Sequence, residues 1–192
     1  MKFHPIIIFL SAILLSACSM VQGDVSVKVE VAKDVFLTLP KPNQLEKNID
    51  ASQLISATWG EQKEQSLLVQ LQADQQKVVL AGFSAWGAKL LSLDYSGDKI
   101  ETYVLSGFSD TLPKPQQILF NVMLSLWPTT AWQPELDKIG WQLTEQPLQR
   151  TLIDEKGNVI ITINYENEAP LAGLITLKHH TLNYIITIKT NN

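Results

Sequence analysis

Alternation of apolar and polar residues is the feature that most limits the folds open to this chain of 192 residues. Val25, Val27, Val29 and Val31 alternate with polar residues, a period of two that puts all four on one face of a strand. Turn residues separate further runs of this kind along most of the chain. The pattern predicts strands at 25–31, 35–39, 53–59, 66–73, 77–83, 89–95, 100–105, 141–145, 149–153, 158–165, 171–178 and 182–189.

One segment past the middle of the chain has helical spacing instead. Within residues 116–127 the apolar side chains fall three and four residues apart, at Leu119, Val122, Met123 and Leu126. Pro113 and Pro115 suit the entry to a helix, and Pro128 ends it. A second, shorter helix is expected at 132–139, before Gly140.

A sheet of this size must bury its apolar face. Open sheets rarely exceed about 10 strands without curling or splitting into two layers. We expect an α+β fold in which a strongly curled antiparallel half-barrel of about 10–11 strands has helices over its concave face, because the apolar stripe of 116–127 then has a place to pack. A two-layer sandwich and a closed barrel stay open as alternatives.

The N-terminus is typical of a secreted lipoprotein. Residues 1–17 comprise a basic Lys2, an apolar run at 6–15 and small residues before Cys18, and the run is too short to span a membrane. The order Leu-Ser-Ala-Cys is that of a bacterial lipobox, and Cys18 is the only cysteine. We expect a signal peptide at 1–17, a lipidated Cys18 with a short tether at 18–23, and a single domain at 24–192. The alternative is an ordinary signal peptide with a chance cysteine.

The net charge, and the lack of the residue patterns that metal sites and hydrolases need, argue against several functions. A net charge of -4 disfavours nucleic-acid binding, which needs a basic face. His179 and His180 are adjacent, so on a strand they point to opposite faces and cannot share a metal. Residues 82–87 do not match the G-x-S-x-G turn of serine hydrolases, and Asp154 and Glu155 fit a solvated turn. We therefore expect no enzyme, no cofactor and no metal site.

Several passages carry a resemblance to a known superfamily. Besides the lipobox and the proline-entered helix, these are Leu-Ala-Gly-Phe-Ser-Ala-Trp-Gly at 80–87, Leu-Leu-Ser-Leu-Asp-Tyr at 90–95 and Leu-Ser-Leu-Trp-Pro at 124–128. Together they resemble the LolB family of outer-membrane lipoprotein receptors and the LolA family of soluble periplasmic carriers. More closely, they resemble an uncharacterised branch of LolB-like lipoproteins associated with aryl-polyene-type gene clusters.

The resemblance implies a function as well as a fold. It implies a curled sheet with helices around an apolar cavity that takes acyl or polyene chains, including those of lipoproteins, for delivery to the outer membrane. The protein is then anchored at the periplasmic face of the outer membrane through acyl chains on Cys18, with lipid or lipoprotein cargo and a LolA-like periplasmic carrier as partners. We expect a monomer. The alternative is a periplasmic scaffold or assembly subunit without a ligand.

The resemblance also points to particular residues. Trp86 occupies the turn that in LolB carries an exposed, membrane-contacting apolar residue, although Ala85 replaces the usual proline. Packing of Trp86 onto the core is the equal alternative. The residues expected to line the cavity, or else to form an ordinary packed core, are Trp59, Leu67, Val69, Leu71, Leu91, Leu93, Leu119, Met123, Val159, Ile161 and Ile163.

Two further features have a functional and a structural interpretation. Trp127, Trp132 and Trp141 surround the exit of the helix, where they form either a lid or, as we favour, a plain aromatic cluster. Arg150 is the only arginine, and it either meets a lipid headgroup or is a surface strand charge, the interpretation we favour.

Overall fold

The computed structural model describes residues 21–25, 27–61, 63–108 and 113–191, without the side chains of 21–25. The predicted signal segment 1–17 and Cys18 lie outside these ranges. Residues 21–23, predicted as part of the tether, belong to the first strand.

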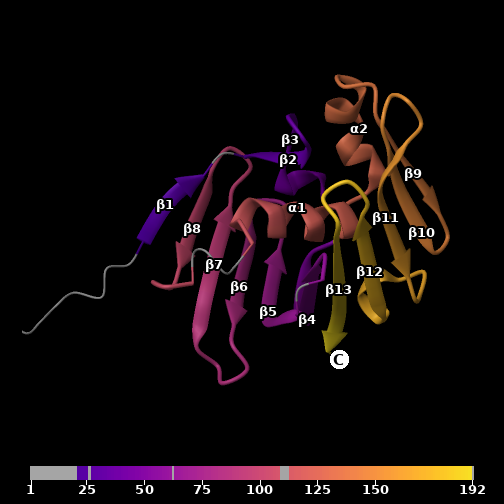
Figure 1. Ribbon diagram of the computed structural model, residues 1–192. Helices are drawn as coiled ribbons and strands as arrows, with labels where there is room; N and C mark the ends of the chain where they lie inside the picture. Colours follow the sequence, from indigo (N-terminus) through magenta and orange to yellow (C-terminus); the bar gives the residue numbers. More distant parts are fainter. Residues whose placement is uncertain (1–20, 26, 62, 109–112, 192) are drawn as a thin grey trace, which may run out of the picture.

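Within the described residues, eleven strands form one antiparallel sheet (Figure 1). Its order is β1-β8-β7-β6-β5-β4-β13-β12-β11-β10-β9, so β1 and β9 are its edges. The strands are β1 (Val21–Val25), β4 (Ile49–Trp59), β5 (Gln65–Ala73), β6 (Val78–Phe83), β7 (Lys89–Tyr95), β8 (Ile100–Val104), β9 (Gln142–Gln146), β10 (Gln149–Ile153), β11 (Val159–Tyr165), β12 (Leu174–His179) and β13 (Tyr184–Asn191). A separate hairpin pairs β2 (Lys28–Ala32) with β3 (Val35–Thr38).

Pairing of β4 with β13 joins the two halves of the sheet. Strands β4 to β8 and strands β9 to β13 each form a run of sequence neighbours, and β1 adds to β8 at the edge. Strands β4 and β13 are far apart in the sequence and meet in the middle of the sheet. Their register runs from Trp59 opposite Tyr184 to Ser52 opposite Asn191. This long-range ladder makes the chain one sheet rather than two separate meanders.

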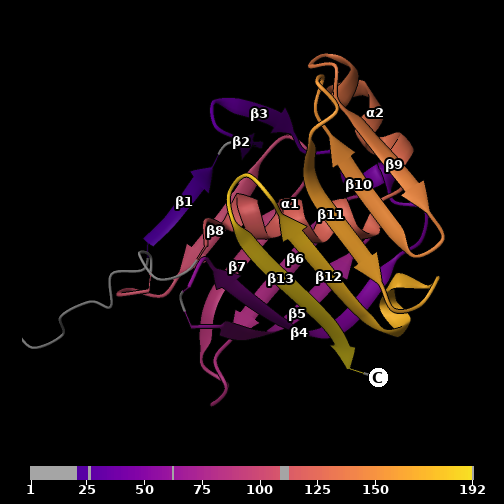
Figure 2. The ribbon, with the colours of Figure 1, turned by 45° about the vertical axis from the view of Figure 1, so that its right-hand side comes forward.

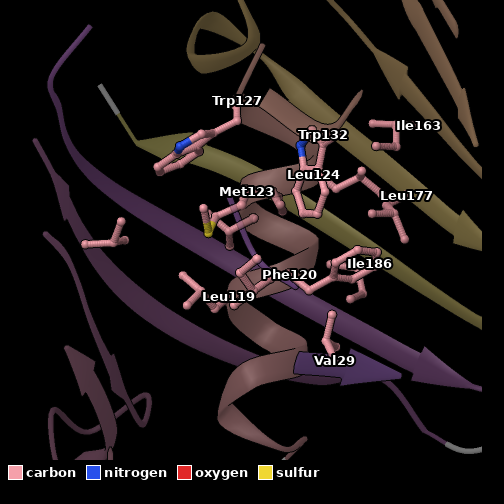
Figure 3. Close-up of a cluster of buried hydrophobic side chains, with 14 of the residues drawn as sticks. Val29, Leu119, Phe120, Met123, Leu124, Trp127, Trp132, Ile163, Leu177 and Ile186 are labelled. Carbon is pink, nitrogen blue, oxygen red and sulfur yellow. The ribbon is translucent and has the colours of Figure 1, made fainter. Parts of the chain in front are cut away.

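The described residues also include two α-helices, α1 (Pro115–Leu126) and α2 (Thr129–Asp137), and two 3-10 turns, at Pro42–Gln44 and Pro170–Ala172. Helix α1 lies between the sheet and the β2–β3 hairpin, and it contacts β2, β7 and β12 (Figures 1 and 2). All residues from Leu119 to Ser125 are buried, so α1 is covered on every side there, although its sequence has the pattern of a one-sided amphipathic helix. Figure 3 shows the cluster that joins α1 to the sheet and hairpin: Val29, Leu119, Phe120, Met123, Leu124, Ile163, Leu177 and Ile186.

The predicted α+β class, a mostly antiparallel sheet with two helices, is confirmed for the described residues. Eight predicted strands agree with observed ones to within one residue, and helix 116–127 corresponds to α1. Strand β4 starts four residues before its prediction, because polar Asp50 and Ser52 separate the buried Ile49 and Ala51. The predicted strand at 171–178 starts only at Leu174, since Pro170–Ala172 form a 3-10 turn.

The prediction of one strand at 25–31 is wrong. Val25 ends β1, which pairs with β8 in the large sheet, whereas Val29 and Val31 lie in β2 of the hairpin. The alternation does continue across the break, and Val29 and Val31 are buried. Periodicity records which side chains are buried but not which sheet buries them.

Arg150 is neither a surface charge nor free to meet a headgroup. Its side chain is buried, and Nη1 donates to the carbonyl oxygens of Trp127 at 2.6 Å and Leu124 at 3.2 Å. Its Nε donates to Oε1 of the half-exposed Glu145 at 2.8 Å. The guanidinium thus satisfies carbonyl groups at the C-terminal end of α1, where a cation also favours the helix dipole.

Arg150→Met is expected to lower the free energy of unfolding by about 2–4 kcal/mol, because it leaves two buried carbonyl groups unpaired and Glu145 without its cation. Urea denaturation followed by circular dichroism measures this loss. Glu145→Gln is the matched control, which keeps both carbonyl bonds and so costs about 1 kcal/mol or less. Equal losses in the two variants would contradict a capping role for Arg150.

Candidate functional site

A cavity of about 780 Å³ lies where α1, the sheet and the β2–β3 hairpin meet. Its wall is mainly apolar and comes from β4, β5, β6, β7, β13 and α1. The apolar lining residues are Val29, Phe36, Ile55, Ala57, Trp59, Leu67, Val69, Leu80, Leu90, Leu91, Phe108, Pro113, Ile118, Val122, Leu182, Ile186 and Ile188. A hollow of this size and lining has the properties of a small-molecule site.

Strand register explains why the wall is apolar. Ile55 of β4 lies between Ile188 of β13 and Leu67 of β5, and all three line the cavity. Two residues along β4, Ala57 lies opposite Ile186. Side chains on a strand alternate between faces, so every second residue of these three strands points to the cavity side.

A small polar network anchors α1 on this wall. The Tyr184 hydroxyl donates to Asn121 Oδ1 at 3.0 Å and accepts from Gln117 Nε2 at 3.1 Å. Burial raises the pKa of the Tyr184 hydroxyl well above its usual value, so it stays protonated near neutral pH. These bonds tie the first two turns of α1 to β13.

Another lining residue on α1 has an unpaired polar atom. The side-chain oxygen Oε1 of Gln116 is buried and has no hydrogen-bond partner within the described parts of the chain.

Exposed residues, including Lys28, Glu30, Phe36 and Lys114, also line the cavity, which shows that part of its wall reaches solvent.

Four of the predicted lining residues lie on this wall: Trp59, Leu67, Val69 and Leu91. Six others are fully buried in the packed core and do not line it, so their assignment to the cavity was wrong: Leu71, Leu93, Leu119, Met123, Ile161 and Ile163. They lie where α1 and the remaining elements pack directly on the sheet. Alternation identified their buried face, but not which part of that face stays uncovered.

The prediction that Val159 lines the cavity failed for a different reason. The ladder between β10 and β11 has a bulge, in which Leu152 faces Ile161 while Ile153 faces Val159. Ile160 is therefore the extra residue, and it is buried beside Ile161. The bulge turns Val159 outward, where it is 41% exposed, so its prediction as a cavity residue is wrong.

Sequence reasoning missed several residues of the site. The strand at 182–189 had the required alternation, yet Tyr184, Ile186 and Ile188 were not predicted to line the cavity. Gln117 and Asn121 were missed because polar residues on a helix usually face solvent. No pattern in the sequence links them to Tyr184, more than 60 residues away.

Trp86 is 78% exposed, so it does not fold back onto the core. It lies in the turn between β6 and β7, where the Ala88 amide donates to Ser84 Oγ at 3.1 Å and the Gly87 amide donates to the Ser84 carbonyl at 2.9 Å. Gly87 has φ of +83°, a conformation that favours glycine. This ordered turn holds the indole away from the sheet.

The three tryptophans that follow α1 in the sequence, Trp127, Trp132 and Trp141, are buried in the core. Trp132 packs edge-on against Phe120 with ring centroids 5.5 Å apart, and the Trp141 indole donates to Glu155 Oε2 at 2.9 Å. Trp127, Trp132 and Trp141 are therefore core residues and do not form a lid.

His179 is a buried packing residue next to the cavity wall. Its Nε2 lies 3.0 Å from the Val31 carbonyl oxygen, and its Nδ1 accepts from the Leu182 amide at 3.2 Å. These partners fix the neutral tautomer with hydrogen on Nε2. Burial lowers the pKa of His179 to about 4, and its ring lies 4.8 Å from that of Tyr184. The neighbouring His180 is exposed.

The described ranges contain no group of three or more side chains that could hold a metal ion. In the same ranges, no helix has the length and apolar character needed to cross a membrane.

Comparison with known proteins gives a family and a solved structure. The model of the family described as Protein of unknown function (DUF3261) matches residues 50–192. No curated protein matches the chain. Among solved structures, a LolA superfamily protein from Nitrosomonas europaea is similar, with 8% identity, a TM-score of 0.44, and 80% of this chain and 92% of that chain covered.

The burial of His179 predicts a pH-dependent stability. Its pKa is about 4 in the folded protein and 6.5 when exposed, so between these values the unfolded chain binds a proton that the folded chain does not. The free energy of unfolding is therefore expected to fall by up to about 3 kcal/mol as the pH drops from 6.5 to 4.

Urea denaturation at several pH values measures how the free energy of unfolding changes with pH, which is the slope compared between variants. His179→Gln is expected to flatten it whatever its own stability, while His180→Gln, at the exposed neighbour, keeps it. An unchanged slope in His179→Gln would show that other groups carry the dependence.

Proposed function

The chain belongs to this DUF3261 family, and we propose that it binds the apolar chain of a lipid in its cavity during delivery of lipids or lipoproteins in the cell envelope. The cavity of about 780 Å³ with an apolar wall carries the proposal. Moving a chain from water onto such a wall is favourable by about 0.8 kcal/mol for each buried methylene. The cargo is an acyl or polyene chain, either of a free lipid or of a lipoprotein.

The proposal needs no catalytic step. Transfer of a chain requires an apolar cavity, an opening and a membrane to receive the cargo. The Tyr184 hydroxyl, Gln117 amide and Asn121 carbonyl on the wall are bonded to one another, and Tyr184 keeps its proton. These groups therefore position α1 and do not act as acids or bases.

In this proposal the sheet curls into a half-barrel around α1. Contacts of α1 with both β7 and β12, which belong to opposite halves of the sheet order, support such a curl. Figure 2 displays β13 and β12 in front of α1, with β6 and β7 on its other side. A curled sheet encloses an acyl chain on more sides than a flat one.

We further propose an outer-membrane anchor at the periplasmic face, through acyl chains on Cys18. The lipobox-like order before Cys18 supports attachment of acyl chains to this cysteine. Two or more such chains give stable anchoring. Trp86 is the proposed membrane-contacting residue, since an exposed indole suits the membrane interface. A LolA-like periplasmic carrier is the proposed donor of cargo, and the protein acts as a monomer.

Leu67 and Leu68 provide a matched pair of variants for testing the cavity. They are neighbours on β5, but Leu67 lines the cavity while Leu68 is 38% exposed on the opposite face. Leu67→Trp is expected to fill part of the cavity and weaken binding of a fluorescent fatty acid at least tenfold, whereas Leu68→Trp leaves binding within twofold. Fluorescence titration of both variants measures the difference.

Equal binding by the two Leu→Trp variants would place the chain outside the cavity. Absence of binding by the unaltered protein would instead favour the scaffold alternative, which cross-linking to a protein partner tests.

Trp86→Glu is expected to leave folding intact and to reduce transfer of bound lipid to liposomes about tenfold, because a carboxylate does not enter the membrane interface. Leu148→Glu is the control, an exposed apolar residue in the turn between β9 and β10. Transfer is followed by fluorescence energy transfer between a labelled lipid and labelled vesicles. Transfer of lipid by Trp86→Glu at the rate of the unaltered protein would show that this turn does not contact the membrane during delivery.

A further inference from the structure

The exposed residues among those that line the cavity show where it opens. Gln65 lies at the start of β5, Leu182 lies in the turn between β12 and β13, and Lys114 comes directly before α1. Strand β4 ends beside the start of β13, because Trp59 faces Tyr184 across the antiparallel ladder. The cavity therefore opens between these strand ends and the start of α1, and we call this opening its mouth.

Large apolar side chains are exposed around the mouth. Phe36 of β3 and Leu182 are both exposed although they line the cavity. Trp86 is exposed in the turn that leads into β7, where Leu90 and Leu91 line the cavity. Exposed apolar groups gathered at one place are typical of a contact surface, since their removal from water is favourable. A surface that covers the mouth can bury all three of these side chains.

The first strand of the sheet starts at this same end. Val21 pairs with Val104 of β8, and Val104 pairs with Leu91 of β7, which lines the cavity. From there β1 runs away from the mouth, to Val25 opposite Ile100. The chain that precedes Val21 therefore enters the fold on the side of the mouth.

The proposed anchor leaves little chain between the membrane and the fold. Cys18 precedes Val21 by three residues, which span at most about 11 Å. The other end of β1, at Val25, lies about 14 Å from Val21 at a rise of about 3.4 Å per residue, and the turn at 96–99 extends beyond it. A membrane that holds acyl chains on Cys18 is therefore within reach of the mouth and not of the opposite end of the sheet.

We infer that the mouth of the cavity lies against the membrane that carries the anchor, with Phe36, Leu182 and Trp86 in contact with its lipids. The inference rests on the proposed function, in particular on acyl chains at Cys18, and adds the orientation in which that function is carried out. The exposed Lys114 at the mouth suits the headgroup region, where its ammonium stays in water. A lipid chain then passes between the bilayer and the cavity without crossing water.

Two leucines beyond opposite ends of β12 give a matched pair of label positions. Leu182 follows the strand and is 39% exposed, whereas Leu174 begins it, is 38% exposed and does not line the cavity. The six residues of β12 separate its two ends by about 17 Å. Phe36→Cys, Leu182→Cys and Leu174→Cys each take one nitroxide label, because the lipid on Cys18 blocks the only other thiol.

The labelled, acylated proteins are reconstituted in vesicles of phosphatidylethanolamine and phosphatidylglycerol. Electron paramagnetic resonance compares the accessibility of each label to oxygen, which concentrates in the bilayer, with its accessibility to a nickel chelate, which stays in water. We expect the oxygen-to-nickel ratio to be at least about fivefold higher at positions 36 and 182 than at position 174. A spacer of about 20 Gly and Ser residues between Met20 and Val21 is expected to lower the ratio at 36 and 182 at least twofold, since it releases the mouth from the membrane.

Vesicle flotation and binding of a fluorescent fatty acid, measured on the same proteins, separate the inference from the proposed function. In protein that floats and binds, equal ratios at the three positions, or ratios that the spacer leaves unchanged, would overturn the inference alone. Labels at 36 and 182 that are already shielded in Cys18→Ser protein without vesicles would show that a second copy of the chain covers the mouth, and would overturn it too. Failure to bind the fatty acid would overturn the proposed cargo, and failure to float would overturn the anchor and the inference with it.

Discussion

The fold depends on covering the apolar face of an eleven-stranded sheet with few elements. At about 4.8 Å between strands such a sheet is about 50 Å wide, whereas the 12 residues of α1 make a helix about 18 Å long. The β2–β3 hairpin covers α1 from the other side, and α2 packs at the β9 edge. These elements bury most of the apolar face but not all of it, and the cavity lies in the part left uncovered.

Two polar contacts hold α1 at a fixed distance from the sheet. Near its start, Tyr184 binds Asn121 and Gln117, and near its end, Arg150 binds the carbonyl groups of Leu124 and Trp127. Apolar packing has no direction, so without such anchors α1 could shift and close the cavity. The anchors give a physical reason why the cavity persists as a feature of the fold.

The strands could be predicted because burial on one face imposes a period of two, which Val69, Leu71 and Ala73 of β5 follow. The sequence did not contain the division of the 25–31 run between two sheets, because alternation is the same on both sides of that break. The bulge that turns Val159 outward left no signal either. Burial patterns are local, whereas these features depend on which distant strand pairs with which.

The site was predictable in part for the same reason. Trp59 and Leu67 were found because they share the apolar face of the sheet, but Leu71 and Leu93 on that face are core residues. Whether an apolar residue lines a core or a cavity depends on the reach of α1 and the hairpin. Arg150 was misjudged since a lone cation on a strand gives no sign of the helix end that it meets in the fold.

Native mass spectrometry of the protein purified from its own cell envelope tests the central claim most directly. The account predicts a species whose excess mass is released on activation as a molecule with an acyl or polyene chain, and which is lost in Leu67→Trp. A protein that shows only its own mass, both as isolated and after incubation with lipid vesicles, would contradict the account.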